Sequence, residues 1–214
     1  MGTHGAEQLC THINAIYTKM VSEFKKWGGD VVKFSGDALL VIFEVYEQER
    51  LREMGERRQM ETPDGDEKEE DLRYLNFTGM PLTLSEACKR AVSCGVILHD
   101  VIDTYPAVDG IKLKLHVGVG CGKCMGHVIG GVLGRWEFIL TGSGVEQIGE
   151  AEPAAGPLET VVSPQVWKHV ENDFEGEILG FPYEGFVKVK AKVRQGEGWS
   201  KATAMHCLSL YLSL

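Results

Sequence analysis

The sequence has no apolar run approaching the roughly 20 residues that a membrane-spanning helix needs. It also lacks a basic N-terminal region followed by an apolar core, so we expect no secretory signal and a cytoplasmic protein. Basic residues are fewer than acidic ones, 22 against 31, which gives a net charge of -9. Such an acidic surface repels nucleic acids and anionic lipids, so neither nucleic acid nor a membrane is expected as a partner.

The six cysteines lack the spacing of a disulfide framework, so we expect reduced thiols. Cys121 and Cys124 do form a C-x-x-C step, and His127 follows closely. This pattern could hold zinc, but it offers only three local ligands, and strand alternation would send some of them to opposite faces. The sequence therefore favours buried or turn cysteines over a zinc site.

A chain of 214 residues can bury a proper core, and we expect a single domain over residues 1–214. Residues 47–81 differ in character, because charged side chains dominate there and apolar ones are few. A segment of this composition is predicted to be a mobile, acidic insertion. Residues 191–214 are expected to form a C-terminal extension, whose apolar part is either a last strand or an irregular end.

Hydrophobic periodicity predicts the main elements. Apolar residues at steps of three and four predict a helix from Gly5 to Trp27, which Gly28 and Gly29 end. Thr83 to Glu86 resembles a helix start, and the helix should end before Pro106. Strict alternation predicts a strand over residues 112–121. Further strands are predicted at 128–129, 136–140, 160–162 and 185–189, and short helices after 142 and over 164–170.

The most informative stretch runs from Gly28 to Phe43. Two apolar runs, Val31 to Phe34 and Ala38 to Phe43, are joined by Ser35-Gly36-Asp37, which predicts a tight hairpin. Gly36 can take the positive φ that the reversal needs, and Asp37 is then held at the hairpin tip with Lys33 on the opposing strand. A carboxylate in such a place suits Mg²⁺, although a turn aspartate and a solvated lysine also occur in ordinary hairpins.

This hairpin resembles the signature hairpin of the class III adenylyl and guanylyl cyclases, and most closely that of the first catalytic domain of soluble, bicarbonate-responsive adenylyl cyclases. Two further stretches, residues 113–122 and 135–142, resemble the central strands of that family and the segment before its next helix. The resemblance implies an α+β, ferredoxin-like βαββαβ fold, with an antiparallel sheet and helices on one face.

One departure from the family is large. Its first, central strand carries a second metal-binding aspartate in an Asp-Ile segment, and no such segment occurs here. The sheet should then have a gap with two exposed strand edges, which natural proteins avoid. We therefore expect this chain to be a piece of a longer polypeptide, or another chain to complete its sheet.

The resemblance also implies the site. Asp37 would bind Mg²⁺ or Mn²⁺, and ATP would be the substrate. Lys33, Phe34, Gly36, Leu140 and Thr141 would line the substrate site. The ribose-positioning asparagine of the family would fall at Gln147 and its transition-state arginine at Ala151.

Two hypotheses follow. In the first, the chain supplies the metal-binding half of a composite adenylyl cyclase site, and a second cyclase-homology domain supplies the rest. In the second, it is a catalytically degenerate cyclase-homology domain that acts as a dimerisation or scaffold module.

Overall fold

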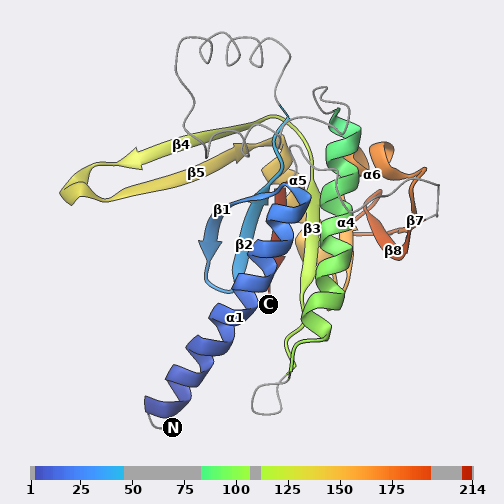
Figure 1. The fold of residues 1–214 in the computed structure, drawn as a ribbon. Helices are drawn as coiled ribbons and strands as arrows, with labels where there is room; N and C mark the ends of the chain where they lie inside the picture. The colour runs from blue at the N-terminus through green and yellow to red at the C-terminus, as the bar shows by residue number, and fades with distance from the viewer. Residues whose placement is uncertain (1–2, 46–82, 107–111, 194–208, 214) are drawn as a thin grey trace, which may run out of the picture.

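The computed structural model describes residues 3–45, 83–106, 112–193 and 209–213. The fold is α+β: the described strands form a seven-stranded sheet in the order β1-β2-β9-β3-β6-β8-β7 and a separate two-stranded sheet, β4-β5 (Figure 1). The predicted acidic insertion, 47–81, lies outside the described residues. In the part of the chain that is described, no helix has the length and apolar character needed to cross a membrane.

The N-terminal part of the fold follows the sequence pattern closely. Helix α1 (Thr3–Trp27) buries Ile16, Met20 and Phe24 completely, and Gly28 ends it with a φ of 83°. The strands β1 (Asp30–Ser35) and β2 (Ala38–Ile42) then form the predicted hairpin.

Helix α4 (Leu84–Asp103) starts at the predicted place, because Thr83 and Glu86 form a capping box. The Thr83 side chain accepts a hydrogen bond from the Glu86 backbone N–H, and the Glu86 carboxylate accepts one from the Thr83 backbone N–H. The helix buries Ala87, Ala91 and Leu98 in the main core.

The central strand β3 (His116–Gly120) carries helices on both of its faces. A side-chain methyl of Val117 lies close to Gly95 of α4, whereas Gly118 lies under α5 (Ser143–Ala154). A Cβ atom at Gly118 would lie 2.5 Å from the backbone nitrogen of Glu152, so only glycine permits this approach. The sequence predicted helices on one face, but α5 covers the face opposite α4. The predicted antiparallel sheet is also mixed, because β3 pairs in parallel with β6 (Thr160–Val162).

The expected gap in the sheet is filled by the chain itself. Strand β9 (Ser209–Ser213) lies between β2 and β3 and is antiparallel to both, with Leu212 opposite Leu39 on one side and Leu210 opposite Val119 on the other. This is the central position that a ferredoxin-like sheet gives to its first strand. The two exposed strand edges predicted from the sequence therefore do not occur, because backbone hydrogen bonds can be supplied by a segment from elsewhere in the chain.

The far edge of the sheet is formed after helix α6 (Pro164–Val170), whose N-cap is Ser163. There β8 (Val187–Val193) pairs with β6 and with the edge strand β7 (Phe174–Ile178). The sequence did not predict β7, because only its first residue is buried.

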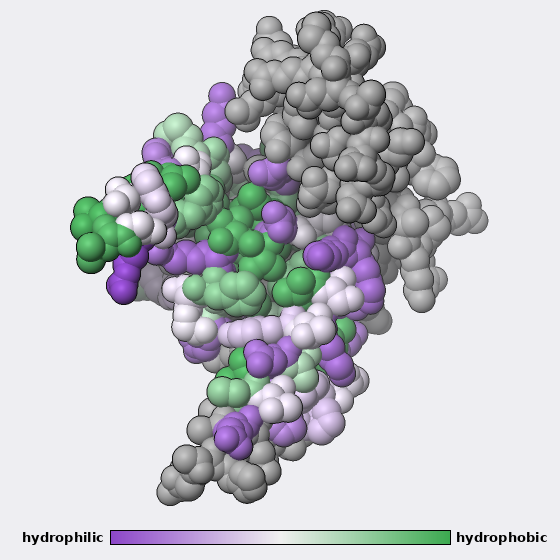
Figure 2. Space-filling view, turned by 60° about the vertical axis from the view of Figure 1, so that its left-hand side comes forward, coloured by the Kyte–Doolittle hydropathy of each residue, from purple (hydrophilic) through white to green (hydrophobic). Residues whose placement is uncertain are grey.

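The strands β4 (Cys124–Gly130) and β5 (Trp136–Gly142) form an arm that projects from the body of the molecule, with the short helix η2 (Val132–Gly134) at its tip (Figure 1). Apolar side chains gather on this arm (Figure 2). Its exposed large hydrophobic residues are Met125, Val128, Ile129, Val132, Leu133, Trp136, Phe138 and Ile139.

Candidate functional site

The hairpin tip holds Asp37 on well-defined backbone. Ser35 and Ala38 are paired in register, and Gly36 between them takes a φ of 65° with open space where a Cβ would lie. The requirement for glycine is thus conformational and not steric, as the sequence predicted. Asp37 is exposed beside Gly36, while the next two residues are buried in the sheet. The carboxylate therefore faces solvent from a rigid support.

Helix α1 holds the hairpin through Tyr17. Its hydroxyl donates to the Gly36 carbonyl at 3.4 Å, and its ring packs edge-on against Phe34 with the centroids 5.4 Å apart. Burial raises the pKa of Tyr17, and the negative charge of Asp37 raises that pKa further. Phe34 remains about half exposed, so one face of its ring is available to a ligand.

Lys33 forms an ion pair with Glu137, which lies on the arm strand β5. Both side chains are exposed, so the pair is screened by water and its contribution to stability is small. The contact joins the β1–β2 hairpin to the strand that also carries Leu140 and Thr141. No feature of the sequence indicated Glu137 as the partner of Lys33.

Leu140 and Thr141, the other predicted substrate contacts, lie near the base of the arm. Leu140 is half-buried and pairs in register with Gly126. The Thr141 hydroxyl is hydrogen-bonded to Nε2 of His127 at 3.0 Å. The structure thus brings Lys33 to the strand of these two residues, whereas no described contact joins them to Asp37.

The predicted positions on α5 make contacts within the domain. The amide oxygen of Gln147 accepts from the Cys121 N–H at 3.0 Å and from the Ser163 hydroxyl at 2.7 Å, and its amide nitrogen donates to the Cys121 carbonyl at 2.8 Å. Ala151 is fully buried in a small core cluster. Gln147 therefore has a structural role that its residue type did not reveal.

The sequence of α5, Ser-Gly-Val-Glu-Gln-Ile-Gly-Glu-Ala-Glu-Pro-Ala, contains no basic residue in any register. Its solvent-exposed positions include Glu146 and Glu150. This helix cannot provide a cation to stabilise negative charge on a phosphate.

At the tip of the described hairpin, Asp37 is the acidic residue that a divalent cation would meet. Strand β9 lies beside the hairpin with Ser213 opposite Ala38, and its sequence, Ser-Leu-Tyr-Leu-Ser, contains no acid. Mg²⁺ is commonly held by one or two carboxylates together with substrate phosphates. Asp37 can be the first carboxylate ligand, and β9 does not supply a second one.

The C-x-x-C step does not form a metal site with the nearby histidine. The Cys124 thiol lies at the start of α5, where burial raises its pKa and the backbone N–H groups of Gly144 and Val145 partly offset that rise. His127 is instead hydrogen-bonded to Thr141. The preference for turn or buried cysteines is consistent with this arrangement, because Cys121 is buried and Cys124 is half-buried.

Comparison with known sequences gives a specific result. No protein-family model matches the chain. Adenylate cyclase type 10 of Oryctolagus cuniculus is 24% identical over 185 residues, which are 86% of this chain and 9% of that protein. The Homo sapiens enzyme of the same name gives the same identity and coverage. The chain therefore spans less than a tenth of the length of these relatives.

Solved structures with the same fold are cyclase domains. The guanylyl cyclase domain of the RhoGC fusion protein from Blastocladiella emersonii matches with a TM-score of 0.59 and 16% identity, over 88% of this chain and 83% of that one. The adenylyl cyclase CyaB from P. aeruginosa matches with a TM-score of 0.51 and 14% identity, over 97% and 83%. Sequence similarity and fold agree with the resemblance seen in the hairpin: most of the chain is similar in sequence to adenylate cyclase type 10, and it has the fold of class III cyclase catalytic domains.

Proposed function

We propose that this domain supplies one half of a composite adenylyl cyclase site, in which the 3′-hydroxyl of ATP attacks the α-phosphate to give cyclic AMP and pyrophosphate. The observation that carries the proposal is the exposed Asp37 carboxylate, held on an anchored hairpin in a domain with the cyclase fold. Because α5 carries no basic residue, the proposal assigns the cation for the transition state to a second domain.

Asp37 is the proposed ligand of Mg²⁺ or Mn²⁺. Such an ion, when bound, neutralises developing charge on the nucleotide phosphates and orients them. Tyr17 and Phe34 keep the hairpin in place, so that Asp37 presents its oxygens without reorganising the backbone. Since β9 carries no acid, the remaining ligands would come from the nucleotide and from the partner domain.

Lys33 is the proposed contact to the adenine base or to a phosphate. In the structure its ammonium group is paired with Glu137, so a nucleotide would have to replace that carboxylate. The exchange is feasible because both side chains are exposed and the ion pair is weak.

The arm is the proposed contact to the second cyclase-homology domain. In the register of β4 and β5, Val128, Trp136 and Phe138 lie on one face of the arm, because directly paired residues share a face. All three are exposed, and a clustered apolar surface of this kind marks an interaction site. One crystal structure of the Blastocladiella emersonii guanylyl cyclase domain is a non-canonical dimer and another is monomeric, so a domain of this fold can pair but also occurs unpaired.

The test uses the full chain, alone and mixed with a second cyclase domain that carries a transition-state arginine. With Mn²⁺ or Mg²⁺, the mixture should convert ATP to cyclic AMP, and a GTP arm tests base selection. Asp37→Asn should lower the rate at least about 100-fold, because a ligand of the metal is lost. Asp30→Asn removes the same charge at the far end of β1 and should leave the rate unchanged.

A mixture that makes no cyclic nucleotide would contradict the proposal. So would equal effects of Asp37→Asn and Asp30→Asn, because Asp37 would then have no role at the reacting phosphate.

A second candidate function is a pairing module without catalysis. It is favoured by two observations: β9, in the central position of the sheet, has no acidic residue, and α5 has no basic residue. This function predicts that the chain associates with a second domain but binds no nucleotide. ATP binding by calorimetry that weakens in Asp37→Ala would exclude it.

A further inference from the structure

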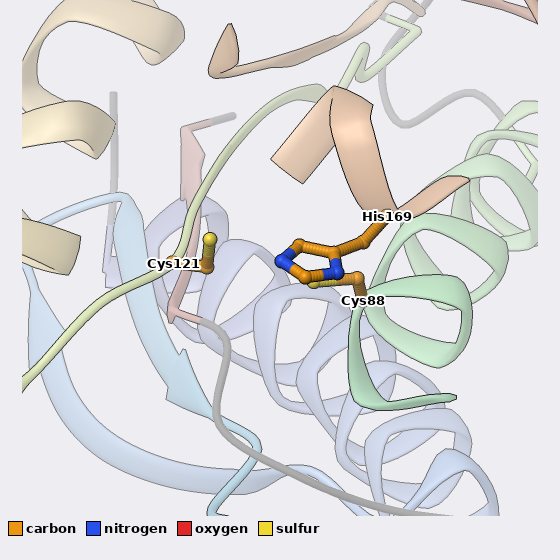
Figure 3. A group of neighbouring side chains, drawn as sticks. All are labelled: Cys88, Cys121 and His169. Atoms are coloured by element: carbon orange, nitrogen blue, oxygen red, sulfur yellow. The ribbon is translucent and has the colours of Figure 1, made fainter. Parts of the chain in front are cut away.

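Two cysteines and a histidine from three separate elements meet in the core. Cys88 lies on α4, Cys121 directly follows β3, and His169 lies in the last turn of α6 (Figure 3). One potential ligand atom from each residue lies within 4.8 Å of the other two. Figure 3 shows one imidazole nitrogen of His169 pointing toward Cys121. None of the sequence patterns brought these three residues together.

The histidine ring is oriented by a neighbour. Its Nδ1 is hydrogen-bonded to the hydroxyl of Ser85 on α4 at 2.9 Å, which leaves Nε2 for the sulfur atoms. A metal-binding histidine is commonly held in this way: when Nδ1–H donates to a neighbouring oxygen, here that of Ser85, Nε2 carries the lone pair for the metal. Ser85 is therefore a positioning residue for His169.

The Gln147 side chain holds both Cys121 and the start of the helix that carries His169. Gln147 is hydrogen-bonded to both backbone groups of Cys121 and accepts from the hydroxyl of Ser163. Ser163 in turn caps α6, because its oxygen accepts from the Val166 N–H at 3.2 Å. The backbone of Cys121 and the start of α6 are therefore held by hydrogen bonds without a metal ion.

The two thiols are buried together. Cys88 is 0% and Cys121 5% exposed, within the main apolar core. A hydrogen bond between the two side chains brings the sulfur atoms into contact. They therefore lie side by side, as two ligands of one ion do.

We propose that Cys88, Cys121 and His169 bind a Zn²⁺ ion. Zinc favours thiolate and imidazole ligands, with Zn–S bonds of about 2.3 Å, which places two sulfurs about 3.8 Å apart around a tetrahedral ion. The donors, at most 4.8 Å apart, need to close by only about 1 Å to reach this geometry. A hard cation such as Mg²⁺ would find no oxygen ligand among the three.

Zinc binding releases two protons and leaves the site without net charge. Both thiols lose their protons to solvent as two Zn–S bonds form, and the Nε2 lone pair of neutral His169 provides the third bond. Two thiolates cancel the charge of Zn²⁺, so the core receives a neutral unit and not an isolated charge. His169 is half-buried, so it is the ligand nearest to solvent, and a water molecule is the proposed fourth ligand.

The consequence is a cross-link. Zinc would tie α4 and α6 to the end of β3, at the point where the chain enters the arm. This site is separate from Asp37 and its proposed magnesium, so the two proposals fail independently.

The test is zinc binding to the full chain, stripped with chelator and kept reduced. Calorimetry should show one equivalent of Zn²⁺, and Co²⁺ should give the intense visible and thiolate charge-transfer absorption of a tetrahedral thiolate site. At a free zinc concentration of 100 times Kd, the Tm should rise by about 5 to 10 °C. Cys88→Ser, Cys121→Ser and His169→Gln should each weaken binding at least about 100-fold, and Ser85→Ala about 10-fold.

Two variants are matched controls. Cys94→Ser replaces another buried cysteine of α4, and Cys124→Ser replaces the other cysteine of the C-x-x-C step; both should bind zinc as the unchanged chain does. Circular dichroism checks that each variant folds. If the cysteine variants do not fold, zinc binding to His169→Gln decides the test, because this substitution is at a half-buried position. No bound zinc, or binding unaffected by His169→Gln, would overturn the proposal.

Discussion

The two hairpins of this domain are built from similar local patterns but lie in different surroundings. In the β1–β2 hairpin, β2 is an interior strand of a seven-stranded sheet, and Leu39 and Val41 are almost completely buried. In the β4–β5 arm, the strands pair only with each other among the described residues, and Trp136 is 64% and Leu133 91% exposed. A local β pattern thus specifies a hairpin, but the neighbouring layers decide which apolar side chains become core.

The arm keeps its shape through local contacts. The Phe138 ring lies over Gly126, where a Cβ would approach it to 2.6 Å, and the Trp136 ring lies over Gly131 in the same way at 3.2 Å. An isolated two-stranded sheet is marginally stable in water, so these rings help to hold the strands together. The rest of its apolar surface is left to be covered by a partner.

The largest expected effect is a difference between the hairpins in how much an alanine substitution lowers the free energy of unfolding. Leu39→Ala should lower the free energy of unfolding by about 2 to 5 kcal/mol, because it opens a cavity in the core. Ile129→Ala on the arm should change it by less than about 0.5 kcal/mol, because that side chain is exposed. Urea unfolding of the full chain measures both. Similar losses in the two variants would show that the arm is packed in solution.

The next effect is a pH dependence of stability that arises in the body of the domain and not in the arm. His99 on α4 is hydrogen-bonded to Thr160 of β6, and burial lowers its pKa from 6.5 to about 4, although Asp100 and Glu159 oppose the shift. The folded state therefore takes up this proton at lower pH than the unfolded state does. The stability contributed by the neutral imidazole is complete above about pH 6.5 and decreases toward pH 4, by up to about 3 kcal/mol.

Urea unfolding at several pH values measures this slope. His99→Gln should remove most of it, whereas His127→Gln, on the exposed arm, is the matched control and should preserve it. A slope that persists in His99→Gln would assign the pH dependence to other groups.

A smaller effect tests the arm as a pairing surface. Trp136→Ser should weaken association with a second cyclase domain about 30-fold, the loss expected for a central aromatic residue of an interface. Analytical ultracentrifugation gives the association constant. Phe181→Ser is the control, because Phe181 is also highly exposed but lies outside the arm. If both substitutions weakened association equally, the effect would be one of general hydrophobicity and not of the arm.

The smallest effect concerns the one ion pair between the hairpins. Glu137→Gln should change the free energy of unfolding by less than about 1 kcal/mol, because both members of the Lys33–Glu137 pair are exposed. It should nevertheless strengthen ATP binding, since Lys33 no longer has a competing carboxylate. Calorimetry with ATP measures this, and unchanged affinity would indicate that Lys33 does not contact the nucleotide.

Much of the fold could be predicted because local signals were strong. The apolar stripe of α1, the glycine turn before Asp37 and the capping box of α4 each specify structure within a few residues. The hairpin that carries the candidate site was predicted, and Asp37 and Lys33 lie on it as expected. The roles of Glu137 and Gln147 could not be predicted, because each depends on a contact with a residue far away in the chain.

The sequence alone determined the hairpin, the helix boundaries and the resemblance to cyclases, since these depend on side chains close together along the chain. Only the tertiary structure decided that β9 fills the centre of the sheet, because backbone pairing carries little sequence information about its partner. The same holds for Cys88, Cys121 and His169, which packing of three elements brings together. Distant residues meet through the folding of the whole domain, which no local pattern encodes.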